Sequence, residues 1–242
     1  MARSLSTRAR FAVSYLALGA LVGVGIGSFL VLLQSDPPPP PPPWSRWQPT
    51  AAEADTSTRM LEIANHVGGT YKLPSGNQLV AIQTQSTNAN FQGVVVVKPD
   101  NATQLDQQFG RDDTAVFLFC GSPKTCKIDE GSPTVARGTV LRREALELAL
   151  YTFEYAHPID NVLIFFPPGK GEKSLTSTLF FQRDDLKSSL KHPLRRTLPQ
   201  VNPPLPGQIR PAEMKTVNEL TGDKRYKYLG TSQDVIVIQP PA

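Results

Sequence analysis

The sequence LRREALELALYTFEY, residues 141–155, decides the fold of this chain. Projected on a helix, it leaves a narrow polar arc that consists of Arg143, Glu147 and Glu154, flanked by Arg142 and Glu144. The rest of its circumference is apolar, and a helix of that kind must be covered by other elements on two sides. We therefore expect a long central helix over residues 134–155.

Two short apolar runs frame this helix. The runs AVFLFC, residues 115–120, and NVLIFF, residues 161–166, lack the alternation of half-exposed strands. They indicate strands that are buried on both faces, which is typical of parallel pairing. Strand, helix and strand of these lengths form a right-handed β-α-β unit. The sequence thus predicts an α+β domain whose mixed β-sheet contains this unit and is covered by helices.

Further elements are expected on both sides of this unit. Before it we expect a helix over 55–67 that ends at Gly68 and Gly69, strands at 78–85 and 93–98 joined by a polar turn, and a short, ambiguous helix at 101–109. After it we expect a hairpin into a strand at 175–182, a short capped helix over 183–194, a proline-rich loop over 194–211, a helix over 212–220, and a closing hairpin with Gly230 at or near its turn.

The N-terminal region carries an uncharged stretch, FAVSYLALGALVGVGIGSFLVLL, residues 11–33. As a helix it would be roughly 35 Å long, enough to cross a hydrocarbon core of about 30 Å. It exceeds the ~7–15 residues expected of the apolar part of a cleaved signal peptide, and no clean small-x-small cleavage site follows it. We expect an uncleaved signal anchor, with a cleaved signal peptide as the alternative.

The charges around this stretch predict its orientation. Three arginines precede it, whereas mainly acidic residues follow it at Asp36, Glu53 and Asp55. This asymmetry places the N-terminus in the cytoplasm. We expect a cytoplasmic tail at 1–10, a single span of the plasma (inner) membrane at 11–33, a proline-rich linker at 34–54 and an extracytoplasmic domain at 55–242.

The linker contains seven consecutive prolines, residues 37–43, followed by Trp44 and Trp47. A polyproline II segment rises ~3.1 Å per residue, so the prolines form a semi-rigid spacer of about 22 Å. The two tryptophans have two interpretations: they dock the linker on the domain, or they lie at a membrane or partner surface.

The net charge of +4 comes mainly from the N-terminal arginines. The chain has 25 basic and 21 acidic residues, and three of the basic ones precede the apolar stretch, so the remainder is only +1 (22 − 21). This balance gives no sign of nucleic-acid binding. Residues 183–242 nevertheless carry ten basic and six acidic residues. Within them Lys187, Lys191, Arg195 and Arg196 indicate contact with an anionic envelope polymer or lipid headgroups, or else a merely solvated face.

Glycines repeat at every fourth position of the apolar stretch, at Gly19, Gly23 and Gly27. Such a ridge of small residues lets membrane helices approach closely. It predicts self-association or association with another span, although glycine is also common in a plain anchor.

The two cysteines, Cys120 and Cys126, lie in FCGSPKTCK. In an oxidising compartment this spacing across Gly-Ser-Pro predicts a structural disulfide that closes a short loop, worth about 2 kcal/mol. Free thiols are one alternative. Redox or metal chemistry is another and is weaker, because a redox pair usually has only two residues between its cysteines.

The sequence contains no motif that would assign a chemical reaction to the protein. The sequence has no nucleophile elbow, zinc spacing, dinucleotide fingerprint or Walker loop, and PPGKGEKS, residues 167–174, is better explained as a hairpin turn. The three histidines are scattered, so no metal or cofactor is expected. Arg143 and Glu147 are best explained as a solvated ion pair at i, i+4. Asn101-Ala-Thr103 would be a glycosylation site in a secretory pathway.

The sequence therefore favours a membrane-tethered extracytoplasmic binding or scaffold module of the cell envelope, with no assigned activity. The alternative is a membrane-tethered extracytoplasmic hydrolase. Its site would lie at the C-terminal edge of the buried strands, near residues 120–124 and 167–173, because ligands gather there in open α/β sheets.

Overall fold

The computed structural model describes residues 12, 15–22, 43–50, 55–84, 91–120, 130–168 and 176–241. The chain divides into two units, Met1–Pro42 and Pro43–Ala242. In the first unit residues 12 and 15–22 are helical, and the rest of the predicted span and most of the proline run lie outside the described residues. Among the residues that are described, none of the helices combines the length and the apolar character needed to cross a membrane.

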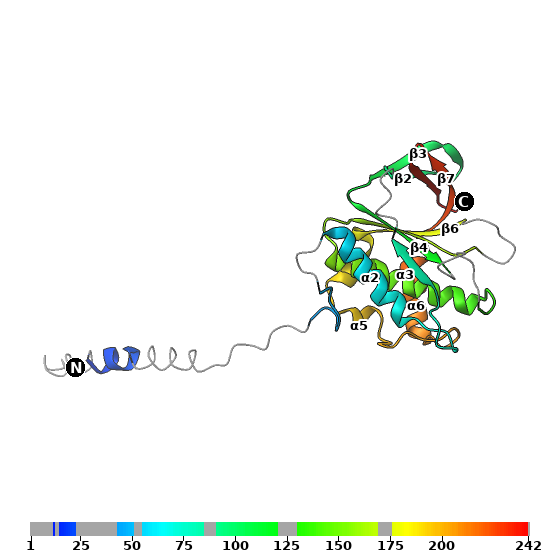
Figure 1. The fold of residues 1–242 in the computed structure, drawn as a ribbon. Helices are drawn as coiled ribbons and strands as arrows, with labels where there is room; N and C mark the ends of the chain where they lie inside the picture. Colours follow the sequence, from blue (N-terminus) through cyan, green and yellow to red (C-terminus); the bar gives the residue numbers. More distant parts are fainter. Residues whose placement is uncertain are drawn as a thin grey trace. The chain divides into compact units, whose positions relative to one another are not determined.

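The second unit is built on one mixed β-sheet (Figure 1). Eight described strands run in the order β1-β4-β5-β6-β7-β8-β2-β3. They are β1 Ala81–Thr84, β2 Gly93–Lys98, β3 Asn101–Gly110, β4 Thr114–Cys120, β5 Asn161–Phe165, β6 Ser177–Gln182, β7 Arg225–Ser232 and β8 Val235–Gln239. The pairs β4–β5 and β2–β8 are parallel and the others antiparallel, which confirms the predicted α+β class with a mixed sheet.

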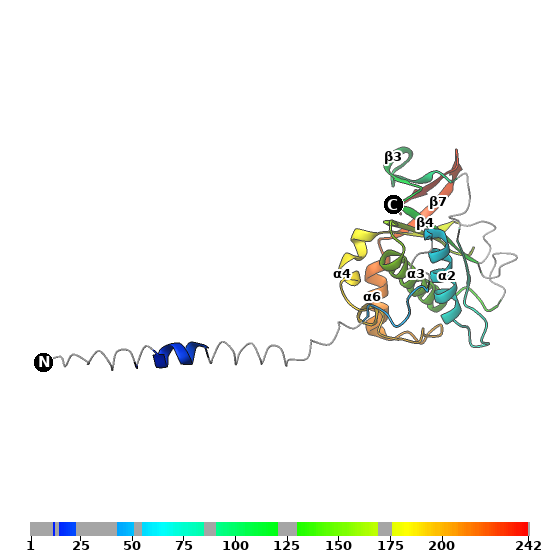
Figure 2. The same ribbon diagram turned by 60° about the vertical axis from the view of Figure 1, so that its left-hand side comes forward.

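Helices cover one face of this sheet. The longer ones are α2 Thr56–Thr70, α3 Val135–Tyr155 and α6 Pro211–Thr221, and the short ones are η1 Arg183–Leu186, α4 Lys187–Leu190 and α5 Leu194–Thr197. Figure 2 shows α2, α3, α4 and α6 on the same side of the strands. The side chain of Thr134 caps the start of α3 by accepting a hydrogen bond from the amide of Arg137.

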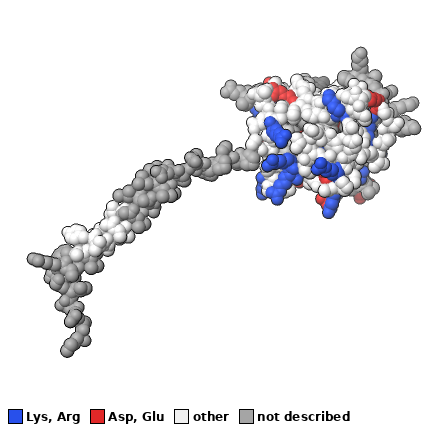
Figure 3. Space-filling view, turned by 90° about the horizontal axis from the view of Figure 1, so that it is seen from below, with Lys and Arg blue, Asp and Glu red and all other residues white. Residues whose placement is uncertain are grey.

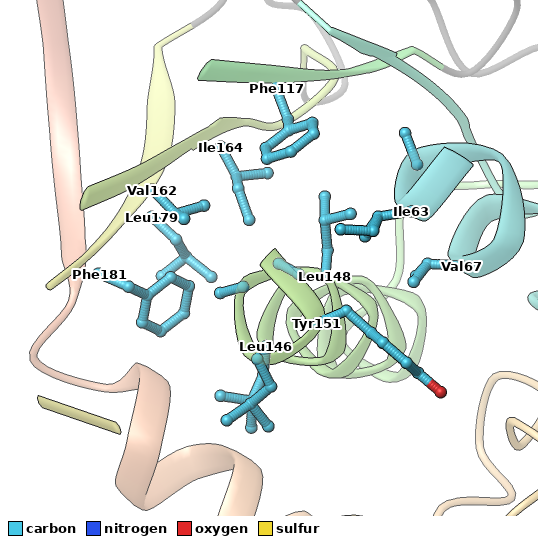
Figure 4. Close-up of a cluster of buried hydrophobic side chains, with 14 of the residues drawn as sticks. Ile63, Val67, Phe117, Leu146, Leu148, Tyr151, Val162, Ile164, Leu179 and Phe181 are labelled. Atoms are coloured by element: carbon cyan, nitrogen blue, oxygen red, sulfur yellow. The ribbon is translucent and has the colours of Figure 1, made fainter. Parts of the chain in front are cut away.

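The central helix is covered on two sides, as its sequence predicts. Figure 4 shows Leu148 of α3 between Ile63 of α2 and Phe117 of the sheet. Leu146 belongs to the same cluster of buried side chains. The predicted β-α-β unit is confirmed, because α3 connects β4 to β5 and these two strands pair in parallel.

The strands β4 and β5 are buried on both faces because the sheet curls over itself. Figures 1 and 2 show β3 and β7 on the side of the sheet away from the helices. A second apolar cluster fills the space between the two halves, with Val116, Leu163 and Phe180 on one side and Val94 and Ile238 on the other. Apolar burial on both faces explains why these strands lack alternation.

Several predicted elements are wrong in type or pairing. Residues 101–109 form not a short helix but the edge strand β3, paired with β2. The runs at 78–85 and 93–98 are not adjacent in the sheet, because β1 pairs with β4 while β2 pairs with β3 and β8. The first helix continues through Gly68 to Thr70. A Cβ at Gly68 would lie 3.2 Å from Ile82, so β1 packs closely on this turn.

The C-terminal elements are mostly as predicted. The strand at 175–182 is β6, which pairs antiparallel with β5, and the helix at 212–220 is α6. The predicted closing hairpin consists of β7 and β8, but its turn lies at Gln233 and Asp234, both with positive φ, and not at Gly230. Gly230 lies within β7 at a register shift, where its φ of 147° suits a bulge.

Candidate functional site

The two tryptophans dock the end of the linker on the domain. The Trp47 ring stacks on His66 of α2, with ring centroids 4.0 Å apart and planes 3° from parallel. The Trp44 ring meets Tyr151 and Tyr155 of α3 edge-on, at 5.4 and 5.8 Å between centroids. Of the two interpretations given by the sequence, docking on the domain is therefore confirmed.

Burial keeps this aromatic cluster uncharged near neutral pH. The half-buried position of His66 lowers its pKa below the ordinary value of 6.5. Burial also raises the pKa of Tyr151 to about 12. The docked segment is therefore held by ring packing and by hydrogen bonds, such as the one of 3.2 Å between the hydroxyls of Ser45 and Tyr155.

The docked segment lies directly beside α5. The amide of Leu194, the first residue of α5, donates a hydrogen bond of 2.8 Å to the carbonyl oxygen of Trp44. Arg46, two residues further along the docked segment, is exposed, as are Arg195 and Arg196 of α5. We group Arg46 with the basic cluster at 187–196 because the segments that carry them are bonded to each other.

We call the resulting region the cationic surface. It consists of Arg46, Lys187, Lys191, Arg195, Arg196 and Arg210, all of them exposed. Arg210 is linked to the region through Gln200, whose side-chain oxygen accepts a hydrogen bond of 2.8 Å from the Arg210 amide. Figure 3 views the domain from below, relative to Figure 1, and shows more Lys and Arg than Asp and Glu on this side.

Acidic residues are missing from the segments that form the cationic surface. The sequence has no Asp or Glu between Leu186 and Ala212, and none from Pro43 to Thr50. Among the described residues, Lys187 is the only member of the cationic surface that forms an ion pair, at 3.8 Å from the exposed carboxylate of Asp184. An exposed pair at that distance contributes little, so the charge of the surface is left almost unbalanced.

A buried charged cluster lies beneath this surface and fixes the proline-rich loop. The Arg143 guanidinium donates hydrogen bonds of 2.6 Å to Glu213, 3.0 Å to Glu147 and 2.7 Å to the Gln200 carbonyl oxygen. It also donates to the hydroxyl of Tyr71, which in turn donates to Glu147 at 2.5 Å. Glu213 accepts a further bond of 3.0 Å from the Gln200 amide.

The prediction of a solvated Arg143–Glu147 pair is wrong. The pair forms, but the Arg143 side chain is 1 % exposed, because α6 and the proline-rich loop cover it. Burial works against the charge of Arg143, yet Tyr71, Glu147 and Glu213 outweigh it and raise the pKa of the guanidinium. Arg143 therefore remains a cation that holds three segments together.

The neighbouring residue Glu144 behaves in the opposite way. Its side chain is fully buried, and neither carboxyl oxygen has a hydrogen-bond partner among the described residues. Burial, reinforced by the nearby Glu147, raises its pKa well above the ordinary 4.5, although Arg143 and Arg137 oppose the shift. The buried environment of Glu144 therefore favours its protonated form, and its burial denies a substrate access to it.

Other predicted site residues fall partly outside the described part of the chain. Cys120 is buried at the end of β4 and disulfide-bonded, whereas Cys126 lies outside the described residues, so their pairing stays a prediction. Gly19 is exposed on a described helical stretch, but Gly23 and Gly27 lie outside it, so the glycine ridge also stays a prediction.

The predicted hydrolase site cannot be assembled from described residues, because 121–129 and 169–175 lie outside them. In the described ranges no group of three or more His, Cys, Asp or Glu could hold a metal ion. His66 packs on Trp47, whereas His192 is exposed after α4. The hydrolase remains an untested alternative.

Sequence reasoning missed two members of the cationic surface and two of the buried cluster. Arg46 and Arg210 lie outside the predicted cluster at 187–196, although the absence of acidic residues from 187 to 211 is a signal for Arg210. Tyr71 and Glu213 gave no signal of their own. Comparison of the chain with protein-family models, with curated proteins and with solved structures gave no match.

Proposed function

We propose that this chain is a membrane-tethered binding or scaffold module of the cell envelope. In this proposal residues 1–10 lie in the cytoplasm, 11–33 cross the plasma (inner) membrane as a signal anchor, and the domain lies outside. The observation that supports it most is the unbalanced cationic surface, which lies where the tether leaves the domain at Pro43. A charge excess of this kind suits the binding of an anionic ligand.

The docked linker supports a scaffold role. The packing of Trp44 and Trp47 on α2 and α3 fixes the point at which the chain leaves the domain. A fixed exit point keeps the cationic surface and the start of the tether on neighbouring segments of the domain.

The bonded state of Cys120 supports the extracytoplasmic location. Disulfides persist in oxidising compartments and are rare in the cytosol. Protein recovered from outside the membrane should therefore contain no free thiol, whereas a domain in a reducing cytoplasm should show two.

A topology measurement tests the proposal. A protease added to spheroplasts should remove everything beyond the proline run and leave the first ten residues protected. An alkaline phosphatase reporter fused after Ala242 should be active, because this enzyme matures only outside the cytoplasm. If the reporter is inactive and a cytoplasmic reporter at the same position is active, the proposed orientation is wrong.

The glycine ridge adds association through the span to this proposal. If Gly19, Gly23 and Gly27 pack against a second helix, Gly23→Ile should weaken association in a membrane two-hybrid assay far more than Leu18→Ile. Equal and negligible effects of the two substitutions would reduce the span to a plain anchor.

A further inference from the structure

We propose that the cationic surface binds an anionic polymer of the cell envelope, a chain that carries repeated phosphate or carboxylate groups. The inference rests on the proposed function, which places the domain outside the membrane. It names the partner of the surface defined above by Arg46, Lys187, Lys191, Arg195, Arg196 and Arg210.

The composition of the surface fits a polyanion. Four of its six cations are arginines, whose planar guanidinium groups match the oxygens of phosphate and carboxylate in pairs. None of these four arginines has an acidic partner within ion-pair distance among the described residues. Their donors are therefore available, and their mutual repulsion is relieved when an anion binds.

The backbone that carries these cations is held in place before any ligand arrives. The start of α5 is bonded to the docked segment at Trp44, and the loop that follows α5 is bonded to Arg143 and Glu213 through Gln200. A surface that is already ordered loses little conformational freedom on binding. Only the ends of the exposed side chains need to become ordered.

The spread of the cations favours a polymer over a single small anion. The six cations come from three stretches of the chain, at 46, 187–196 and 210, and these stretches contain no acidic residue. A chain with repeated anionic groups can contact several of these cations at once, and its charge is complementary to theirs.

A binding measurement on the full chain tests this inference. The chain is held in nanodiscs of zwitterionic lipid and titrated with fluorescent polyphosphate in one series and polyglutamate in another. Binding of at least one polymer is expected, with an affinity that falls steeply as salt is added. The two series separate a phosphate polymer from a carboxylate polymer.

Matched triple variants assign the binding to the cationic surface. Lys191→Gln/Arg195→Gln/Arg196→Gln should weaken binding by about 10- to 100-fold at low salt, since each cation near an anionic surface contributes several-fold. The control Lys72→Gln/Lys98→Gln/Lys227→Gln removes the same charge outside this surface and should weaken binding less than about threefold. Unchanged circular dichroism shows that both variants are folded.

Three outcomes would overturn the inference. They are absence of binding to both polymers, equal losses in the two triple variants, and capture by vesicles of anionic lipid in preference to both polymers. The last outcome would assign the surface to headgroups. Because binding is measured on purified protein, it does not depend on orientation in the cell. An inactive alkaline phosphatase reporter would therefore contradict the proposed function and leave the binding result unaffected.

Discussion

The buried cluster around Arg143 and the cationic surface meet at Gln200, yet they treat charge in opposite ways. In the buried cluster Arg143 is bonded to two carboxylates, a hydroxyl and a carbonyl oxygen. On the surface, Arg195 and Arg196 have no acidic partner among the described residues. A buried charge needs its partners for the fold to be stable, whereas an exposed charge is solvated by water. The unpaired cations are thus the ones free to meet a ligand.

A second contrast lies within α3, between neighbours. Arg143 is fully paired, whereas Glu144 has no hydrogen-bond partner in the described ranges. Arg143 and Arg137 both oppose the rise in the pKa of Glu144, but neither donates a hydrogen bond to it, because Arg137 is bonded to the carbonyl oxygens of Glu130 and Leu79. Burial without a partner is therefore the cause of the raised pKa.

The largest effect is expected from Arg143→Met. The substitution leaves the carboxylates of Glu147 and Glu213 buried without their cation, which should lower the free energy of unfolding by about 3–5 kcal/mol. Urea denaturation measures it. Arg196→Met on the cationic surface is the control and should change stability by less than about 0.5 kcal/mol. Similar effects of the two substitutions would erase the contrast between the regions.

A smaller loss is expected from Tyr71→Phe. The change removes a hydroxyl that accepts from Arg143 and donates to Glu147, and keeps the ring in place. Losing hydrogen bonds to charged groups should lower stability by about 1.5–3 kcal/mol in the same denaturation assay. A change below about 0.5 kcal/mol would mean that the hydroxyl is dispensable and that Arg143 and Glu147 suffice.

The substitution Glu144→Gln should stabilise the protein at neutral and alkaline pH but not at acidic pH. Because the folded pKa of Glu144 lies above its unfolded value of 4.5, the folded state retains a proton that the unfolded state releases. The stability that Glu144 contributes is complete below pH 4.5 and is lost as pH rises through the folded pKa. Because Gln cannot ionise, the free energy of unfolding of the variant should equal that of the wild type near pH 4 and be larger at pH 8. Identical pH profiles of stability would show that Glu144 is ionised in the fold.

The smallest effect on stability is expected from Lys191→Gln/Arg195→Gln/Arg196→Gln. Removing solvated cations that repel one another should change the free energy of unfolding by less than about 0.5 kcal/mol per site, with any gain confined to low salt. Urea denaturation at 20 mM and at 500 mM salt, where the Debye length is about 20 Å and about 4 Å, tests this small effect on stability. A loss comparable to that of Arg143→Met would make the surface cations structural.

How far the sequence predicts each region depends on where its partners lie in the chain. The unit β4-α3-β5 was predicted because its signals are local runs and helical periodicity. The burial of Arg143 was missed because Glu213, Tyr71 and Gln200 lie 70, 72 and 57 residues away. The cluster at 187–196 is predicted from sequence adjacency, whereas the bond between Trp44 and Leu194 depends on the fold. The polar strand β3 was missed because its conformation depends on pairing with β2.

The position of β8 has a consequence for the timing of synthesis. In the described part of the chain, the hairpin of β2 and β3 joins the remaining strands through β8, which is the last strand to be made. Until β8 has been made, the hairpin of β2 and β3 is not bonded to the rest of the sheet, and one edge of β2 stays open. The domain therefore completes its sheet only after residues 235–239 have emerged. An interruption before that point would release a chain with exposed strand edges, which is the kind of species that aggregates or is degraded.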